Sequence, residues 1–331
     1  MSEVLLHITR AGKVESIHRG DIVAVNVAGK VVDAVGDAYK PMFWRSAAKP
    51  FQVLPFVQQG GMDQFGITNE ELALMVSSHS GESQHVALVQ QILEKVGLAL
   101  DVLACGAARP MDGRASKELI KQGQKPQAVH NPCSGKHSGM LALCRMLGLP
   151  VEGYTDSEHQ VQKIMHQAVA ESTGLDAQQI EIGIDGCGVP VFYLPLYNMA
   201  LAYARLVNPI QAGWGDQEQA VTKIRDAMIG YPQVVAGTGR IDTILMNLTK
   251  GRIVAKVGAE AVYCLGSVPD GIGITFKIED GGTRAINPVI IGILKRLDLI
   301  SKAEYDELTE KFPPILKNHR GDIIGTIETV F

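Results

Sequence analysis

Asp21-Ile-Val-Ala-Val-Asn-Val27 and Val31-Val-Asp-Ala-Val35 are two runs rich in β-branched residues, and the turn Ala28-Gly29-Lys30 joins them. Two such runs on either side of a short turn that contains glycine predict an antiparallel β-hairpin. The apolar run Val4–Ile8 precedes them and adds a further strand. The first 35 residues are therefore expected to form an antiparallel meander.

From Ser46 to about Met246 the spacing of the apolar residues becomes that of helices. A capping-box sequence at Thr68–Glu71 predicts one helix start. Gly97, Gly148 and Gly230 are typical of helix ends. The middle of the chain is thus predicted to be a helical lobe.

Strand patterns return after residue 250, in the segments 252–257, 261–265, 273–278 and 322–327, with two helices before the last. Strands at both ends that enclose a run of helices predict an α+β fold, because a doubly wound fold would alternate strands and helices throughout. We expect one antiparallel sheet built from both termini and flanked by helices. A single domain would then have a sheet lobe, about 1–45 and 250–331, and a helical lobe, about 46–249.

The composition favours a globular protein that acts on a small molecule. The 331 residues are 46% hydrophobic, which is enough for a full core. The net charge is -4, with acids and bases mixed along the chain, so no basic surface for nucleic acid or anionic lipid is expected. No apolar run is long enough to cross a bilayer, and Met1–Arg10 makes a poor signal peptide.

The cysteines indicate a reducing compartment. They form an odd, sparse set, namely Cys105, Cys133, Cys144, Cys187 and Cys264. In such a compartment thiols are packed, catalytic or metal-bound rather than paired. We therefore expect a cytoplasmic protein, and a homodimer as the commonest assembly for such a chain.

The first candidate catalytic pair is Ser46 and Lys49, which open an apolar helical stretch that contains Pro50. A spacing of three places both side chains on one face of a helical turn, where a neutral lysine amine can take the proton of the hydroxyl. Serine and lysine fall three apart by chance in many proteins, and a helix cap with a solvated lysine is the simpler interpretation. The buried start of the helix favours the catalytic one.

Two further segments carry chemistry only in combination with this pair. Ser77–His85 is a polar connection between two apolar elements, which suits either the wall of a pocket or a helix boundary. Lys256-Val-Gly258 lies on a predicted strand, where the glycine would let a ligand approach the backbone. A Ser-x-x-Lys helix start, a loop serine and a late Lys-x-Gly strand recur together in serine acyl-transferases of the penicillin-binding and β-lactamase type.

Two cysteines in polar, glycine-rich turns are candidate metal ligands. Cys133 lies in His130-Asn-Pro-Cys-Ser-Gly-Lys-His-Ser-Gly139, and Cys187 lies in Asp185-Gly-Cys-Gly-Val-Pro190. A pair of thiolates favours zinc. The usual spacing of zinc ligands is absent, so a reactive thiol or a buried thiol remains an alternative.

Long motifs make the chain resemble the Rhizobium etli-type L-asparaginases over nearly its full length. They are Arg45-Ser-Ala-Ala-Lys-Pro-Phe-Gln52, Ser78-His-Ser-Gly-Glu82, the 130–139 segment and Asp185–Pro190. The resemblance implies a fold similar to serine β-lactamases and glutaminases. It also implies hydrolysis of the side-chain amide of asparagine, and so an amidohydrolase.

The same resemblance implies the residues of the site. Two serine-lysine tandems fall on Ser46 with Lys49 and on Ser78 with Lys256, although Lys250 and Lys277 compete with Lys256 for the last place. The implied zinc ligands are Cys133, Lys136 and Cys187, completed by water, with Asp185 alongside.

The expected mechanism is attack by a serine on the side-chain carbonyl, loss of ammonia from an acyl-enzyme and release of aspartate by water. Ser46 is the expected nucleophile and Ser78 the proton relay. Side-chain type alone suggests that Arg45, His79, Glu82 and His137 bind the substrate. The alternatives are a glutaminase or a β-lactam-recognising acyl-transferase, and a non-catalytic zinc-binding or amino-acid-binding protein.

Overall fold

The computed structural model describes residues 2–331 and contains a large antiparallel sheet, with strand order β10-β11-β1-β2-β9-β8-β7 and β3 paired to β2. Its strands are β1 (Glu3–Arg10), β2 (Lys13–Asn26), β3 (Val31–Val35), β7 (Ile253–Gly258), β8 (Val262–Ser267), β9 (Ile272–Ile278), β10 (Ile315–Lys317) and β11 (Ile323–Thr329). The first and last strands pair, as at Leu6 with Thr329. The predicted α+β class, with one antiparallel sheet built from both termini, is confirmed.

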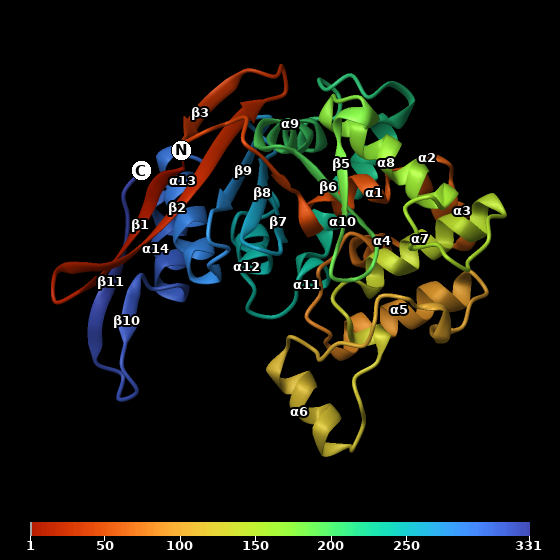
Figure 1. Cartoon of the computed structure of the whole chain (residues 1–331), viewed down its shortest axis with the longest axis horizontal. Helices are drawn as coiled ribbons and strands as arrows, with labels where there is room; N and C mark the ends of the chain where they lie inside the picture. The colour runs from red at the N-terminus through yellow and green to blue at the C-terminus, as the bar shows by residue number, and fades with distance from the viewer. Residues whose placement is uncertain (1) are drawn as a thin grey trace.

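Helices fill the middle of the chain and form a lobe beside the sheet, while the two termini lie close together at the far side of the sheet (Figure 1). They are α1 (Lys49–Gln52), α2 (Leu54–Gln58), α3 (Gly61–Phe65), α4 (Asn69–Met75), α5 (Ser83–Lys95), α6 (Gly113–Lys121), α7 (Ser134–Leu147), α8 (Gln160–Thr173), α9 (Leu196–Val207), α10 (Glu218–Gly230), α11 (Pro232–Val235) and α12 (Ile241–Leu248). Two more helices, α13 (Ile286–Arg296) and α14 (Lys302–Lys311), follow the last central strand.

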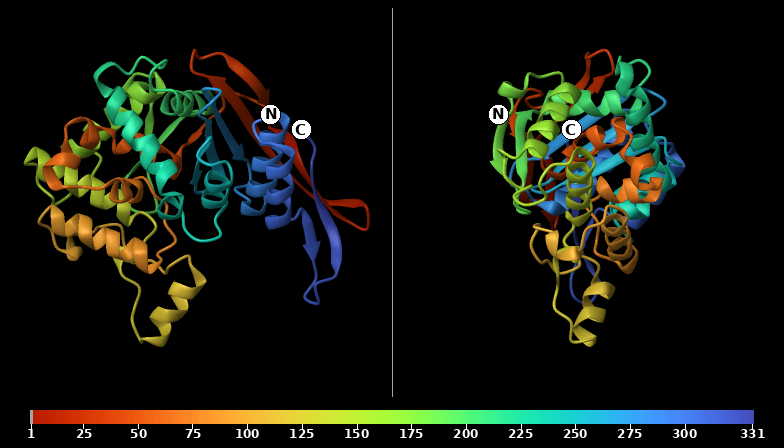
Figure 2. Two further views of the ribbon diagram at one scale, coloured as in Figure 1. Left: turned by 180° about the vertical axis from the view of Figure 1, so that it is seen from behind. Right: turned by 90° about the vertical axis from the view of Figure 1, so that its right-hand side faces the viewer.

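Local signals in the sequence explain several helix boundaries. Thr68 caps α4 through the predicted capping box with Glu71, and Gly148 ends α7 in the left-handed conformation, where a residue without a Cβ has no steric penalty. In contrast to the other helices, α6 buries none of its residues and projects away from the body (Figure 2). None of the helices in residues 2–331 is both long and apolar enough to cross a membrane.

A second, small sheet contains two strands from the region that was expected to be helical, β5 and β6. It has the order β4-β6-β5 and consists of β4 (Pro41–Phe43), β5 (Glu181–Ile184) and β6 (Pro190–Pro195). The expectation was wrong here because the buried run Val191–Leu194 is too short for its period to separate a strand from a helix. The β5–β6 hairpin matters for function, since its turn carries Asp185 and Cys187.

At the centre of the molecule, helices pack directly against strands of the large sheet. α9 packs on β2, β8 and β9, and it lies so close that a Cβ on Gly273 would come within 1.9 Å of the Ala200 carbonyl oxygen. Glycine at this point of β9 is therefore a packing requirement. At the edge of the same sheet, β7 contacts α12 and the turn that contains Ser46.

Candidate active site

Residues of both lobes line a cavity of about 690 Å³. Its wall includes both predicted serines, Ser46 and Ser78, together with Arg45, Cys133, Asp185 and Cys187. Lys49 and Lys256 are almost fully buried, with exposed fractions of 1% and 0%. The two serines therefore face the cavity, while the two lysines lie in the protein interior.

Ser46 lies in the 3₁₀ turn Arg45–Ala48, which leads directly into α1. The preceding residue, Arg45, has a φ of 52°, a conformation that is uncommon for a residue with a side chain and that clusters at functional sites. Arg45 Nε and Nη2 donate to Asp185 Oδ1 at 2.9 and 2.8 Å. This ion pair from the β5–β6 hairpin holds the backbone immediately before Ser46.

Gly258 lets strand β7 approach this turn. A Cβ at position 258 would lie 3.1 Å from the Trp44 carbonyl oxygen and 3.3 Å from Arg45 Cβ. The sequence suggested that this glycine would let a ligand approach the backbone, and Gly258 does line the cavity. A side chain there would also meet Val262 Cγ1, at 2.3 Å. The consequence is that the Ser46 turn lies directly against the strand that carries Lys256.

Ser78 lies between two amines. Lys256 Nζ is 2.8 Å from Ser78 Oγ, and Lys49 Nζ is 3.1 Å from the same oxygen. Lys49 also donates to the Ser77 carbonyl at 2.5 Å, and Lys256 to the Val257 carbonyl at 2.9 Å. The structure thus brings Lys49, Ser78 and Lys256 together. In residues 2–331 the Lys49 backbone amide donates to the Ser46 carbonyl, but no hydrogen bond joins the Ser46 hydroxyl to the Lys49 amine.

The two amines differ in their electrostatic surroundings. Burial lowers the pKa of Lys49, and the Cys133 sulfur opposes this effect. Burial lowers the pKa of Lys256 further, and the positive charge of Lys49 acts in the same direction. Lys256 is therefore the amine that loses its proton more easily, because a neutral amine avoids both the cost of burial and the repulsion between two cations.

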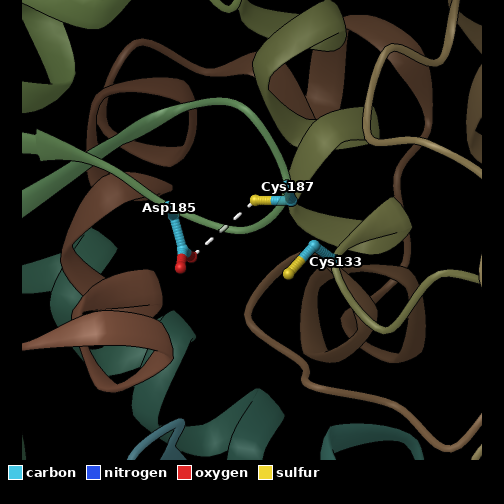
Figure 3. A group of neighbouring side chains, drawn as sticks. All are labelled: Cys133, Asp185 and Cys187. Carbon is cyan, nitrogen blue, oxygen red and sulfur yellow. Dashed lines mark hydrogen bonds between the residues drawn. The ribbon is translucent and has the colours of Figure 1, made fainter.

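Figure 3 shows a second cluster, formed by Cys133, Asp185 and Cys187. One ligand atom from each of Cys133, Asp185 and Cys187 lies within 4.8 Å of the others. Lys136 Nζ is 3.2 Å from Cys187 Sγ, and Lys49 Nζ is 3.5 Å from Cys133 Sγ. The start of α7 and the β5–β6 turn meet here, so residues about 50 positions apart in sequence share one polar site.

Charges and hydrogen bonds inside the cluster shift the pKa values of its two thiols and of Lys136. A hydrogen bond from Cys187 and the nearby lysines lower the pKa of the Cys133 thiol well below its ordinary value, against the effect of burial. The same hydrogen bond raises the pKa of Cys187. Burial lowers the pKa of Lys136, but the two sulfurs and Asp185 outweigh it, and the pKa ends above its usual value. The thiol with the lowered pKa, Cys133, lies beside Lys49, whereas Lys136 contacts Cys187, whose pKa is raised.

The four predicted substrate-binding residues are not all in the cavity wall. His79 Nε2 contacts Ser134 Oγ at 2.8 Å, and Glu82 Oε1 accepts from the Thr238 amide at 2.6 Å. His137 Nδ1 contacts the Tyr154 hydroxyl at 2.6 Å. These three side chains are held by protein partners and do not line the cavity, which leaves only Arg45 in its wall.

Three charged residues that the sequence reasoning missed line the cavity, namely Arg240, Asp242 and Glu260. Arg240 and Glu260 form no ion pair in the part of the chain that the structure describes. Asp242 is fully buried, and its Oδ1 accepts from the Val257 amide at 2.8 Å. An acid shortly before the apolar residues 244–246 was the available signal, but acids are common in the first turn of any helix.

Comparison with known proteins gives one match that covers the chain. A family model described as L-asparaginase II matches residues 6–329, and no curated protein matches significantly.

Solved structures are similar at low identity. A β-lactamase from Mycobacterium bovis is 13% identical over 88% of this chain and 94% of its own, with a TM-score of 0.41. A putative β-lactamase from Bacteroides dorei is 11% identical over 83% and 93%, with a TM-score of 0.43. Simvastatin synthase from Aspergillus terreus is 13% identical over 88% and 93%, with a TM-score of 0.40. These scores are too low to support a functional assignment.

Proposed function

Because this chain belongs to the L-asparaginase II family, we propose that it hydrolyses the side-chain amide of L-asparagine to L-aspartate and ammonia by serine-lysine catalysis. The observation that carries the proposal is Ser78 Oγ lying between two buried amines at the wall of a cavity. A hydroxyl next to a neutral amine can pass on a proton at neutral pH, where an isolated serine cannot.

We assign the attack on the amide carbonyl to Ser46 and the proton relay to Ser78. A relay must contact the base, as Ser78 contacts Lys256. A nucleophile must be free to approach the substrate, and Ser46 lines the cavity without a hydrogen bond from its side chain in residues 2–331. The proton of Ser46 passes through Ser78 to the neutral amine of Lys256. It then returns to the leaving nitrogen, which departs as ammonia, and water releases aspartate from the acyl-enzyme.

Recognition of the amino-acid head needs a cation for the α-carboxylate. Arg45 is already neutralised by Asp185, whereas Arg240 lines the same cavity and forms no ion pair in residues 2–331. We therefore assign the α-carboxylate to Arg240. Arg45 then serves to hold the turn of Ser46.

The donor set of the neighbouring cluster fits zinc. Two sulfurs and one carboxylate are ligands that zinc accepts, and thiolates select it over magnesium or calcium. The Lys136 amine can join them only after it loses its proton. Cys133, Lys136 and Cys187 would hold the ion, with Asp185 alongside. When bound, it supplies positive charge that fixes the β5–β6 turn, and through Asp185 and Arg45 the Ser46 turn, so its effect should be on positioning and substrate affinity.

One assay tests the reaction. Purified protein is incubated with asparagine, glutamine or a β-lactam, and ammonia release or ring opening is measured. We expect ammonia from asparagine, a loss of about 10³-fold or more in Ser46→Ala and in Lys256→Met, and wild-type turnover in Lys250→Met. The last variant is the matched control, because Lys250 lies in the exposed turn after α12. Full turnover by Ser46→Ala would refute its assignment as nucleophile.

A further inference from the structure

Asp242 lies at the start of α12, where it has no assigned function. Its side chain is fully buried, yet it borders the cavity. Oδ1 accepts the Val257 amide hydrogen at 2.8 Å. Oδ2 and the Tyr263 hydroxyl each lack a well-formed hydrogen bond in residues 2–331, although the two groups lie near enough to interact. A buried carboxylate is costly, so a residue that only stabilised the helix start would be expected to face water.

The hydrogen bond of Asp242 falls on the edge of the sheet. β7 is the last strand in the sheet order, so the amide and carbonyl of Val257 on its outer side need partners other than a strand. Asp242 Oδ1 accepts from the Val257 amide at 2.8 Å, and Lys256 Nζ donates to the Val257 carbonyl at 2.9 Å. The Asp242 carboxylate, on α12, and the Lys256 amine, on β7, thus hydrogen-bond to the same residue, Val257.

We propose that Asp242 is a positioning residue for Lys256. Asp242 holds the edge of β7 so that the Lys256 amine stays in contact with Ser78, and it supplies the negative charge that this amine faces once it is protonated. The inference rests on the serine-lysine chemistry proposed above and adds a residue to it. The transfer is balanced: the O–H bond of Ser78 breaks as an N–H bond of Lys256 forms, and Ser78 regains a proton from Ser46.

The surroundings of the Lys256 amine support this assignment. The ionisable groups near it are Lys49, Asp242, Arg240 and Cys133, and Cys264 and Tyr263 lie on the adjacent strand. Burial lowers the pKa of Lys256 most, Lys49 and Arg240 lower it further, and Asp242 is the carboxylate that opposes them. Removing this charge should therefore lower the pKa again and make the amine a weaker proton acceptor.

The test compares wild type with Asp242→Asn, which keeps an oxygen for the Val257 amide and removes the charge. We expect kcat for asparagine to fall by about 10-fold or more with KM little changed, because proton transfer by a positioned base contributes factors of this size. The acidic limb of the pH profile should move to lower pH by about one unit. Asp322→Asn, in the exposed turn before β11, is the matched control and should behave as wild type.

A second readout needs no asparagine. The rate at which a fluorophosphonate probe labels the active serine is followed across the same pH range, and its acidic limb should shift in the same direction. Unshifted pH profiles in Asp242→Asn, with only a lower melting temperature, would show that the residue merely stabilises α12 and would overturn the inference. The proposed function fails separately, if wild type releases no ammonia from asparagine but its serine is still labelled and the limb still shifts.

Discussion

At the scale of single residues, the two lysine amines that contact the Ser78 hydroxyl have different electrostatic surroundings. Lys49 faces the sulfur of Cys133, whereas Lys256 faces the positive charge of Lys49. Two lysines of the same type, both buried and both in contact with Ser78, therefore differ in how readily they lose a proton. In the proposed mechanism Lys256 is the base and Lys49 keeps its proton, as these directions of the pKa require.

Replacing Arg240 with alanine should weaken substrate binding more than chemistry. The α-carboxylate that Arg240 is proposed to bind is not the group that reacts, and Arg240 affects the pKa of Lys256 less than Lys49 or Asp242 does. We therefore expect KM for asparagine to rise by about 10-fold to 100-fold with kcat within a few-fold of wild type. Steady-state kinetics check this, and Arg114→Ala on the exposed helix α6 is the control. A fall in kcat with unchanged KM would move the α-carboxylate away from Arg240.

At the scale of elements, the β5–β6 hairpin connects the metal-like cluster to the Ser46 turn. Its turn supplies Cys187 to the cluster, and through Asp185 it holds Arg45. β7 reaches the same turn from the other side at Gly258. A strand, a hairpin and a helix start therefore fix the nucleophile together, and none of them does so alone.

Removing a thiol from the hairpin should abolish tight zinc binding. We expect Cys187→Ser to lower zinc affinity by about 100-fold or more, since loss of a ligand should exceed the effect of outer groups. Competition with a fluorescent chelator measures this, and Cys144→Ala, within α7, is the control. Affinity should also fall in acid, because the raised pKa of Lys136 means that a proton competes with the metal. Equal affinity in both variants would exclude a metal at this cluster.

At the scale of the whole molecule, buried histidines make the stability of the helical lobe depend on pH. His79, His85 and His137 are buried, and burial lowers the pKa of each. Unfolding restores an ordinary pKa near 6.5, so the unfolded chain takes up more protons below that pH. The stabilisation is complete above about pH 6.5 and is lost as pH falls toward the folded values.

The free energy of unfolding should therefore fall in mild acid, by up to about 1.4 kcal/mol per histidine for each pH unit below 6.5. Urea unfolding between pH 7.5 and 5 measures this slope. His137→Gln should reduce the slope, while His319→Gln, in the exposed loop between β10 and β11, should leave it unchanged. An identical slope in His137→Gln would contradict the assignment.

The sequence by itself determined the fold class and supplied the candidate residues of the site. The runs at 21–35 and 252–278 are rich in β-branched residues and are separated by turns, and long motifs around Ser46, Ser78 and Cys133 predicted the candidate side chains. Such composition is a local property, so it was reliable where turns bounded each run. It failed for the strands β5 and β6, which lie between the helices α8 and α9.

Only the tertiary structure decided how these residues meet. Lys256 is 178 positions from Ser78, yet their side chains are 2.8 Å apart. The structure also showed that Asp242 accepts from the strand that carries Lys256, and that His79, Glu82 and His137 hydrogen-bond to protein groups outside the cavity wall. A pKa depends on burial and on charges from distant elements, so no local pattern contains it.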